Sequence, residues 1–169
     1  TLADFENVEI VFDDVMKLDL NALVAEKFSG CSHVVVCANL PYNITSPVLT
    51  KFVECGAFDC ITVMIQREVA RRICAKENTA DYGAFTVLMQ WYTEAEMLFD
   101  VSPDCFIPAP KVTSSVIRCR MRTSAPYAVK DEKRMFAIVR AAFQQRRKTL
   151  SNALKNSLGV SGEAARNAI

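Results

Sequence analysis

The chain has 169 residues, of which 51% are hydrophobic and 23% charged, enough apolar sequence for one globular domain with a small appendage. No apolar run approaches the roughly 20 residues of a membrane helix, and residues 1–4 lack the pattern of a signal peptide. We therefore expect a soluble, intracellular protein without a membrane partner, in the cytoplasm or, in a eukaryote, in the nucleolus or an organelle.

Charge is divided unevenly along the chain. Residues 1–105 carry 7 Lys and Arg against 16 Asp and Glu, a net charge of −9, whereas residues 106–169 carry 13 against 3, a net charge of +10. The carboxyl-terminal third is therefore a candidate for binding a polyanion.

The cysteines are odd in number and include no C-x-x-C pair, and the lone His33 opens a predicted strand instead of joining a cysteine cluster. The spacing of a zinc site is absent, so we expect no metal. We expect mostly reduced, buried thiols. The seven cysteines are Cys31, Cys37, Cys55, Cys60, Cys74, Cys105 and Cys119.

Strands and helices are expected to alternate along the first two thirds of the chain. The apolar runs at 34–38 and 60–65 are typical of parallel strands that are buried on both faces. The predicted order indicates an α/β domain with a mostly parallel sheet. The predicted strands are 8–12, 34–38, 60–65, 96–101 and 112–119, and the predicted helices are 18–28, 47–53, 67–76 and 84–91.

Residues 122–130 contain a proline and no apolar periodicity, and we predict that they form a linker. The linker would separate a domain of residues 1–121 from a small helical domain of residues 131–169. The apolar residues that recur there at fours and sevens, as on one face of a helix or helix pair, are Val139, Phe143, Leu150, Leu154 and Leu158.

The segment Asn39-Leu40-Pro41-Tyr42 follows strand 34–38 at the sheet edge where open α/β proteins bind ligands. The Asn39 side-chain oxygen and a backbone carbonyl near Pro41 can accept hydrogen bonds from an exocyclic amine, and the Tyr42 ring can stack on a base. Drawing both N–H bonds out of the ring plane makes the amine a better nucleophile, which suggests N-methylation of a nucleobase. These residues are equally typical of a strand-to-helix turn in which proline fixes φ.

Two further segments each allow two interpretations. Asp14 could accept a hydrogen bond from the adenine amine or a ribose hydroxyl of a cofactor. Alternatively, Asp13 and Asp14 could form a solvated turn cap, and from these residues alone we favour the turn cap. The proline-pinned segment from Phe106 to Lys111 could present Phe106 to an unpaired base, with Lys111 near a phosphate. Alternatively, it is a proline-rich connection with Phe106 in the core.

The last amphipathic stretch contains Gln144-Gln145-Arg146-Arg147-Lys148. Sevenfold spacing predicts that its cations form a stripe on one helix, opposite the leucines. Because the region carries the excess positive charge, we favour nucleic-acid binding over a merely solvated face. The cations of the predicted stripe are Arg140, Arg147, Lys148 and Lys155.

Five segments together resemble the ribosomal RNA adenine dimethyltransferases that modify the small-subunit RNA. They are residues 39–44, 66–69, 82–83, 106–116 and 145–150, so the resemblance covers nearly the whole chain. Such enzymes use S-adenosyl-L-methionine to place two methyl groups on N6 of each of two adjacent adenosines near the 3′ end of that RNA. The resemblance therefore implies this cofactor, and small-subunit rRNA and the immature small ribosomal subunit as partners in ribosome biogenesis.

The resemblance also implies roles for single residues. Asn39 and the Leu40-Pro41 backbone would hold the target amine, and Tyr42 and Phe106 would sandwich the flipped adenine. Asp14, with Asn39, would contact the cofactor. Catalysis would depend on positioning for in-line displacement at the methyl group. The residues expected to contact RNA are Lys111, Arg140, Arg146, Arg147, Lys148 and Lys155.

The implied fold is a Rossmann-like methyltransferase domain that lacks its first two strand-helix units, followed by an incomplete helical RNA-binding domain. The chain has no Gly-x-Gly turn to wrap a cofactor. We therefore expect the chain alone to be inactive and to bind the cofactor weakly. We also expect residues 1–30 to be displaced, poorly ordered or paired with another molecule through an open sheet edge. Ordinary parallel pairing of 8–12 with 34–38 would contradict that.

Two other functions stay open. One is a non-catalytic RNA-binding factor of the same fold that acts in ribosome assembly or organellar transcription. The other is a large-subunit rRNA adenine methyltransferase of the antibiotic-resistance branch. The Asn39 to Tyr42 corner favours catalysis, and residues 106–111 with 145–150 favour the small-subunit branch.

Overall fold

The computed structural model describes residues 5–144, 149–159 and 161. Within these ranges the strands are β1 (Val35–Asn39), β2 (Cys60–Gln66), β3 (Thr93–Val101) and β4 (Ser114–Met121). The α-helices are α1 (Leu20–Lys27), α2 (Thr45–Cys55), α3 (Arg67–Ile73), α4 (Ala84–Tyr92), α5 (Glu132–Gln144) and α6 (Leu150–Leu158). Short 3-10 helices cover η2 (Tyr42–Ile44) and η3 (Pro103–Cys105). No helix in the described part of the chain is long and apolar enough to cross a membrane.

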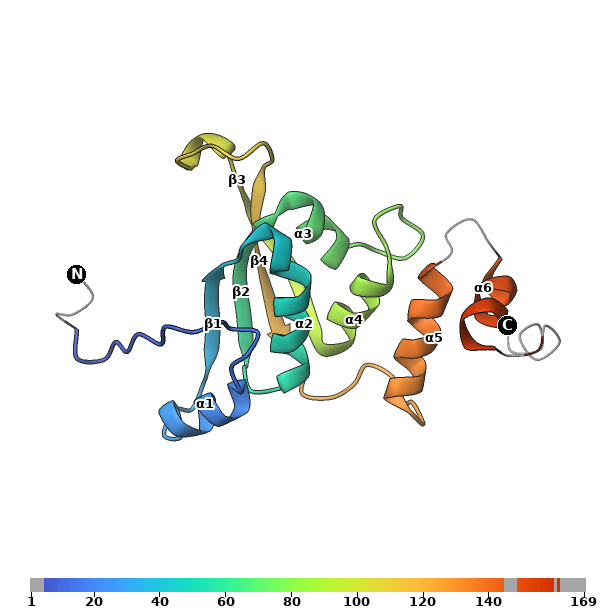
Figure 1. Cartoon of the computed structure of the whole chain (residues 1–169), viewed down its shortest axis with the longest axis horizontal. Coiled ribbons are helices and arrows are strands. Elements are labelled where there is room, and N and C mark those ends of the chain that lie inside the picture. The colour runs from blue at the N-terminus through green and yellow to red at the C-terminus, as the bar shows by residue number, and fades with distance from the viewer. Residues whose placement is uncertain (1–4, 145–148, 160, 162–169) are drawn as a thin grey trace.

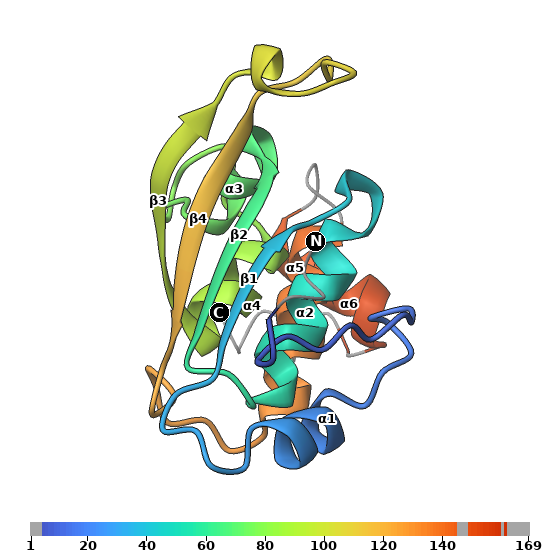
Figure 2. The same cartoon turned by 90° about the vertical axis from the view of Figure 1, so that its left-hand side faces the viewer.

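The strands form one mixed sheet in the order β1-β2-β4-β3 (Figures 1 and 2). β1 and β2 are parallel, but β4 runs antiparallel to both of its neighbours, so the predicted mostly parallel pairing is wrong. The reason lies in residues 102–113, which join β3 to β4 without an α-helix. A parallel neighbour needs a crossover to return the chain to the starting edge, whereas a loop returns it antiparallel.

Helices α2, α3 and α4 cover one face of the sheet (Figure 2). The core between them contains fully buried Leu49 of α2, Ile61 and Ile65 of β2, and Ile117 of β4. β2 alternates between buried and half-buried residues, and β1 alternates between exposed and half-buried ones, with Val35 63% exposed. The prediction that both strands are buried on both faces is therefore wrong, because the described helices cover only one face.

The amino-terminal segment lies outside the sheet. Residues 8–12 have no regular secondary structure, and Ile10 and Phe12 are exposed, so the predicted strand is wrong. Among the described residues β1 has one strand neighbour, β2, so residues 8–12 do not pair with it as ordinary parallel pairing would require. The predicted helix that follows is confirmed as α1, which begins where the Asp19 carboxylate accepts a hydrogen bond from the Ala22 N–H at 3.0 Å.

Beyond the sheet, α5 packs on α4 through Phe136. The Phe136 ring stacks on Tyr92 at a centroid distance of 6.0 Å and meets Trp91 edge-on at 6.1 Å. α5 also packs against α6, where Ala141 and Leu154 are buried together. These contacts agree with the predicted apolar face of a helix pair, while the boundaries of the two domains stay a prediction.

Candidate active site

A pocket of about 290 Å³ lies where β1 ends at the carboxyl edge of the sheet. One wall comes from residues 39–42, directly after β1, and the other comes from the loop between β3 and β4. The structure thus brings together the amine-holding and stacking residues that were predicted from distant segments. The residues that line the pocket are Asn39, Leu40, Pro41, Tyr42, Phe106, Pro108 and Pro110.

The first wall is a sharp exit from the sheet. The Leu40 N–H donates to the Met64 carbonyl at 3.2 Å, which is the last bond to β2 before Pro41 turns the chain away. The Pro41 carbonyl then accepts hydrogen bonds from the Ile44 N–H at 3.2 Å and from the Thr45 hydroxyl at 3.0 Å. The predicted strand-to-helix turn is therefore present, and both lone pairs of the Pro41 oxygen are used within it.

Two acceptors next to this turn have no hydrogen-bond partner among the described residues. They are the Leu40 carbonyl oxygen and the side-chain amide oxygen of Asn39. Asn39 is an exposed residue. The turn and the ligand site are thus compatible: Pro41 holds the turn, and the two residues before it keep acceptors free. The candidate backbone acceptor is consequently Leu40 and not Pro41.

The rings on the two walls are held differently. Tyr42 is half-buried, and its hydroxyl shares a hydrogen bond of 2.7 Å with the hydroxyl of Ser114, a fully buried residue at the start of β4. Phe106 is half-buried in the pocket wall and does not belong to the core, so the core alternative for this ring is wrong. The next residue, Ile107, is fully exposed. The sequence assigned no role to Ser114, although this residue lies within the recognised segment 106–116.

Asp14 does not line this pocket. Its carboxylate accepts a hydrogen bond from the Met16 N–H at 2.9 Å, and the Asp14 N–H donates to the Asp13 carboxylate at 2.7 Å, which is the turn cap favoured from the sequence. The expected roles of Asp14 and Asn39 in binding S-adenosylmethionine stay predictions.

Three of the six predicted RNA-binding cations lie within the described residues, each on a different segment. Lys111 is exposed next to Pro110 of the pocket wall, Arg140 is exposed on α5, and Lys155 is exposed on α6. Thr149 has extended backbone before α6 begins, so Arg140 and Lys155 lie on separate helices and the predicted stripe on one helix is wrong. The remaining three cations, Arg146, Arg147 and Lys148, lie outside the described residues.

A polar network that the sequence did not predict lies beside the loop. The Ser115 hydroxyl donates to the Asp100 carboxylate at 2.5 Å, and the Arg67 guanidinium contacts the same carboxylate at 3.3 Å. The Ser115 hydrogen bond, with Arg67, lowers the pKa of Asp100 although its partial desolvation opposes this. The network joins the end of β3, the start of β4 and α3.

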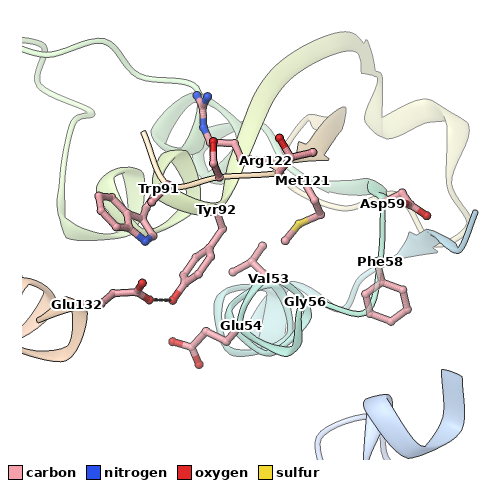
Figure 3. A pocket seen from close by; sticks show the side chains of 13 residues that line it. Val53, Glu54, Gly56, Phe58, Asp59, Trp91, Tyr92, Met121, Arg122 and Glu132 are labelled. Atoms are coloured by element: carbon pink, nitrogen blue, oxygen red, sulfur yellow. Dashed lines mark hydrogen bonds between the residues drawn. The ribbon is translucent and has the colours of Figure 1, made fainter. Parts of the chain in front are cut away.

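A second cavity, of about 460 Å³, lies at the opposite edge, where β2 begins and β4 ends (Figure 3). The Tyr92 hydroxyl donates to the Glu132 carboxylate there. Partial burial is the main cause that raises the pKa of Tyr92, and this hydrogen bond is the second cause. Arg122 donates to the Gln90 carbonyl and, at 2.9 Å, to the Glu94 carboxylate. Most of these polar groups are therefore already paired.

All seven cysteines are free thiols, as predicted, but the prediction that most are buried is wrong. Only Cys119 is buried, whereas Cys31, Cys37 and Cys105 are exposed. Among the described residues no cluster of His, Cys, Asp and Glu has the geometry to hold a metal ion.

Comparison with solved structures defines the class of fold. The chain superposes on the 23S rRNA methyltransferase ErmE with a TM-score of 0.65 and 23% identity, covering 95% of this chain and 66% of that one. It superposes on a dimethyladenosine transferase from Plasmodium falciparum with a TM-score of 0.64 and 28% identity, covering 72% of this chain and 44% of that one. The fold is that of the α/β methyltransferases.

Sequence comparison identifies the family. A model of the ribosomal RNA adenine dimethylases matches residues 1–168, and the chain belongs to this family. It is 47% identical over 159 residues to ribosomal RNA small subunit methyltransferase A of Geobacillus thermodenitrificans, covering 94% of this chain and 54% of the relative. It is 43% identical over 162 residues to the protein of that name from Lachnoclostridium phytofermentans, covering 95% and 56%. The chain thus spans about half the length of these relatives.

Proposed function

We propose that the protein containing this chain transfers methyl groups from S-adenosylmethionine to N6 of two adjacent adenosines near the 3′ end of small-subunit rRNA, in the cytoplasm. Family membership and the names of the relatives support this function. The observation that carries it is the pocket at the end of β1. There Asn39 and Leu40, whose acceptors have no partner within the described residues, line one pocket together with the aromatic residues Tyr42 and Phe106.

The pocket suits an adenine amine because it offers acceptors. The N6 amine donates two hydrogen bonds, one for the Asn39 side-chain oxygen and one for the Leu40 carbonyl oxygen. Guanine places a carbonyl oxygen at the equivalent position, which would face two other oxygens and lose its hydrogen bonds to water. Bonds that draw the amine hydrogens out of the ring plane localise the nitrogen lone pair, and the two rings fix the direction in which it points. The reaction therefore needs no covalent enzyme intermediate.

We further propose that the basic carboxyl-terminal third holds the rRNA backbone, with Lys111 at the pocket and Arg140, Arg146, Arg147, Lys148 and Lys155 beyond it. This region carries a net charge of +10, and Lys111, Arg140 and Lys155 form no ion pair within the described residues. Neutralising Arg146, Arg147 and Lys148 together should reduce the slope of log affinity against log salt by about 2, at roughly 0.7 per lost phosphate contact.

The test is methyl transfer to immature small ribosomal subunits by the full-length protein that contains this chain. Dimethyladenosine is measured by mass spectrometry after digestion of the RNA. Asn39→Ala should reduce transfer at least about 100-fold, as loss of a preorganised polar group does elsewhere, and should leave RNA affinity within about twofold. The matched control is Asn43→Ala, an exposed asparagine of η2 that does not line the pocket.

Each contrary result has a distinct meaning. RNA binding without transfer by the unaltered protein would favour a non-catalytic RNA-binding factor. Transfer to large-subunit RNA alone would favour the antibiotic-resistance branch. Full transfer by Asn39→Ala would show that Asn39 does not hold the amine.

A further inference from the structure

The two walls of the pocket are joined by a single side-chain hydrogen bond. Tyr42 belongs to the wall that follows β1, while Ser114 directly follows the loop that supplies Phe106, Pro108 and Pro110 to the other wall. The 2.7 Å hydrogen bond between their hydroxyls therefore connects the Tyr42 ring on one wall to the residue that follows the loop of the other wall. No other side-chain hydrogen bond between the two walls occurs among the described residues.

The two partners differ in how firmly the backbone holds them. Ser114 is fully buried in β4 and is paired on both sides, with Gln66 of β2 and Val101 of β3. Tyr42 lies in a 3-10 turn after β1, a strand with a neighbour on one side only in the described sheet. The hydrogen bond thus ties a ring beside the edge strand β1 to the first residue of β4, which is paired with a strand on each side.

We propose that Ser114 is a positioning residue that sets the width of the acceptor pocket by fixing the Tyr42 ring opposite Phe106. This inference rests on the proposed function, since the width matters for a base held between the two rings. A stacked base needs a gap of roughly 7 Å, twice the carbon contact distance of about 3.5 Å. Without the Ser114 hydroxyl, Tyr42 is free to rotate away from the base and the amine is no longer held in one direction.

Kinetics of the full-length protein test this role. Ser114→Ala should lower kcat for methyl transfer about tenfold and leave KM for the RNA within about twofold. The hydroxyl of Ser114 holds the Tyr42 ring that orients the target base, but Ser114 itself does not bind the RNA. Tyr42→Phe, which keeps the ring and removes the same bond, should have the same effect. The double variant should be no worse than either single variant, because all three lack one bond.

Ser115→Ala is the matched control. Ser115 is the next residue of β4 and equally buried, but its hydroxyl bonds to Asp100 instead of Tyr42. It should retain kcat within about twofold, and melting temperatures measured alongside separate a loss of folding from a loss of orientation. Equal losses of kcat in Ser114→Ala and Ser115→Ala, or additive losses in the double variant, would overturn the proposal.

A second readout does not depend on methyl transfer. RNA with 2-aminopurine at the target position reports stacking by the fraction of short-lifetime fluorescence. That fraction should fall alike in Ser114→Ala and Tyr42→Phe and stay unchanged in Ser115→Ala. If the unaltered protein transfers no methyl group but shows this pattern, the proposed reaction fails while the positioning role stands. If the unaltered protein shows no stacked population, or Ser114→Ala retains all of it, the positioning role is refuted.

Discussion

Two cavities at opposite edges of one sheet differ in what their polar groups already contact. At the carboxyl edge the pocket holds about 290 Å³, and the acceptors on Asn39 and Leu40 have no partner within the described residues. At the amino edge the cavity holds about 460 Å³, but Tyr92 is bonded to Glu132, and Arg122 is bonded to Glu94. The first cavity offers hydrogen bonds to a ligand. The second mainly uses them to join α4 to α5 and to join Arg122, directly after β4, to α4 and β3.

This difference is why we propose the smaller cavity, and not the larger one, as the functional site. Polar groups of buried residues are usually paired within a protein, so the carbonyl of the buried Leu40, which has no partner among the described residues and lies in a pocket with two rings, is the more informative signal. The contrast between the two cavities would be refuted if the residues that line the smaller pocket proved dispensable for methyl transfer. The contrast would be strengthened if the polar groups of the larger cavity contributed to stability alone.

After Asn39→Ala, the largest effect is expected at the stacking wall. Phe106→Ala should lower kcat/KM for methyl transfer about 50-fold, since stacking on a base contributes about 1–3 kcal/mol. Ile107→Ala is the control, because this neighbour is fully exposed and does not line the pocket. A loss below about twofold in Phe106→Ala would mean that the ring does not contact the base.

A second effect concerns the core of the sheet between the two cavities. Burial raises the pKa of the Cys119 thiol to about 12. The folded state therefore keeps this proton at pH values where the unfolded state has lost it, and stability present below about pH 8.5 falls as pH rises towards 12. Urea unfolding should show about 3 kcal/mol less stability at pH 11 than at pH 8 from this group alone.

The contribution of Cys119 is isolated by comparing two variants. Cys119→Ala should flatten the alkaline loss, whereas Cys37→Ala, which removes an exposed thiol, should keep the slope of the unaltered protein. Identical slopes in all three proteins would show that the thiol titrates alike in the folded and unfolded states.

In the larger cavity, Tyr92→Phe removes the hydroxyl that donates to Glu132. It should lower the free energy of unfolding by about 1 kcal/mol, the usual contribution of one hydrogen bond, and leave methyl transfer unchanged. Tyr127→Phe at an exposed tyrosine should change neither. A fall in transfer without a fall in stability would give the larger cavity a functional role and remove the contrast between the two.

The smallest effect is expected at the rim of the smaller pocket. Lys111→Ala should weaken RNA binding about threefold in filter binding and reduce the salt slope by roughly 0.7, as for one lost phosphate contact. Lys17→Ala, at an exposed lysine of the acidic half, should leave both values unchanged. A salt slope that does not change in Lys111→Ala would exclude a phosphate contact at this position.

Much of the site could be predicted because it depends on local order along the chain. Asn39 had to lie at a sheet edge once residues 34–38 formed a strand, whereas the proline-rich loop alone left Phe106 open to both the pocket and the core. The partner of Tyr42 could not be predicted, since a serine hydroxyl has many possible acceptors and only the pairing of β4 brings Ser114 to it.

The fold was predictable in its elements but not in their pairing. Apolar periodicity locates β1, β2, β3 and β4, yet it does not encode strand direction, which the loop between β3 and β4 decides. Residues 8–12 have the composition of a strand, but a strand needs a neighbour to pair its backbone, and the structure provides none for them. Spacing alone likewise placed Arg140 and Lys155 on one helix, although Thr149 interrupts it.

The occupied Pro41 carbonyl has a consequence for how the proposed reaction ends. Because Ile44 and Thr45 use both lone pairs of that oxygen, the two hydrogen bonds of the amine fall to the acceptors on Asn39 and Leu40. Unmodified adenine satisfies both free acceptors, the monomethylated base satisfies one, and the dimethylated base satisfies neither. At about 1 kcal/mol per hydrogen bond, each methyl group weakens retention about fivefold, so the finished product is the form that leaves most readily.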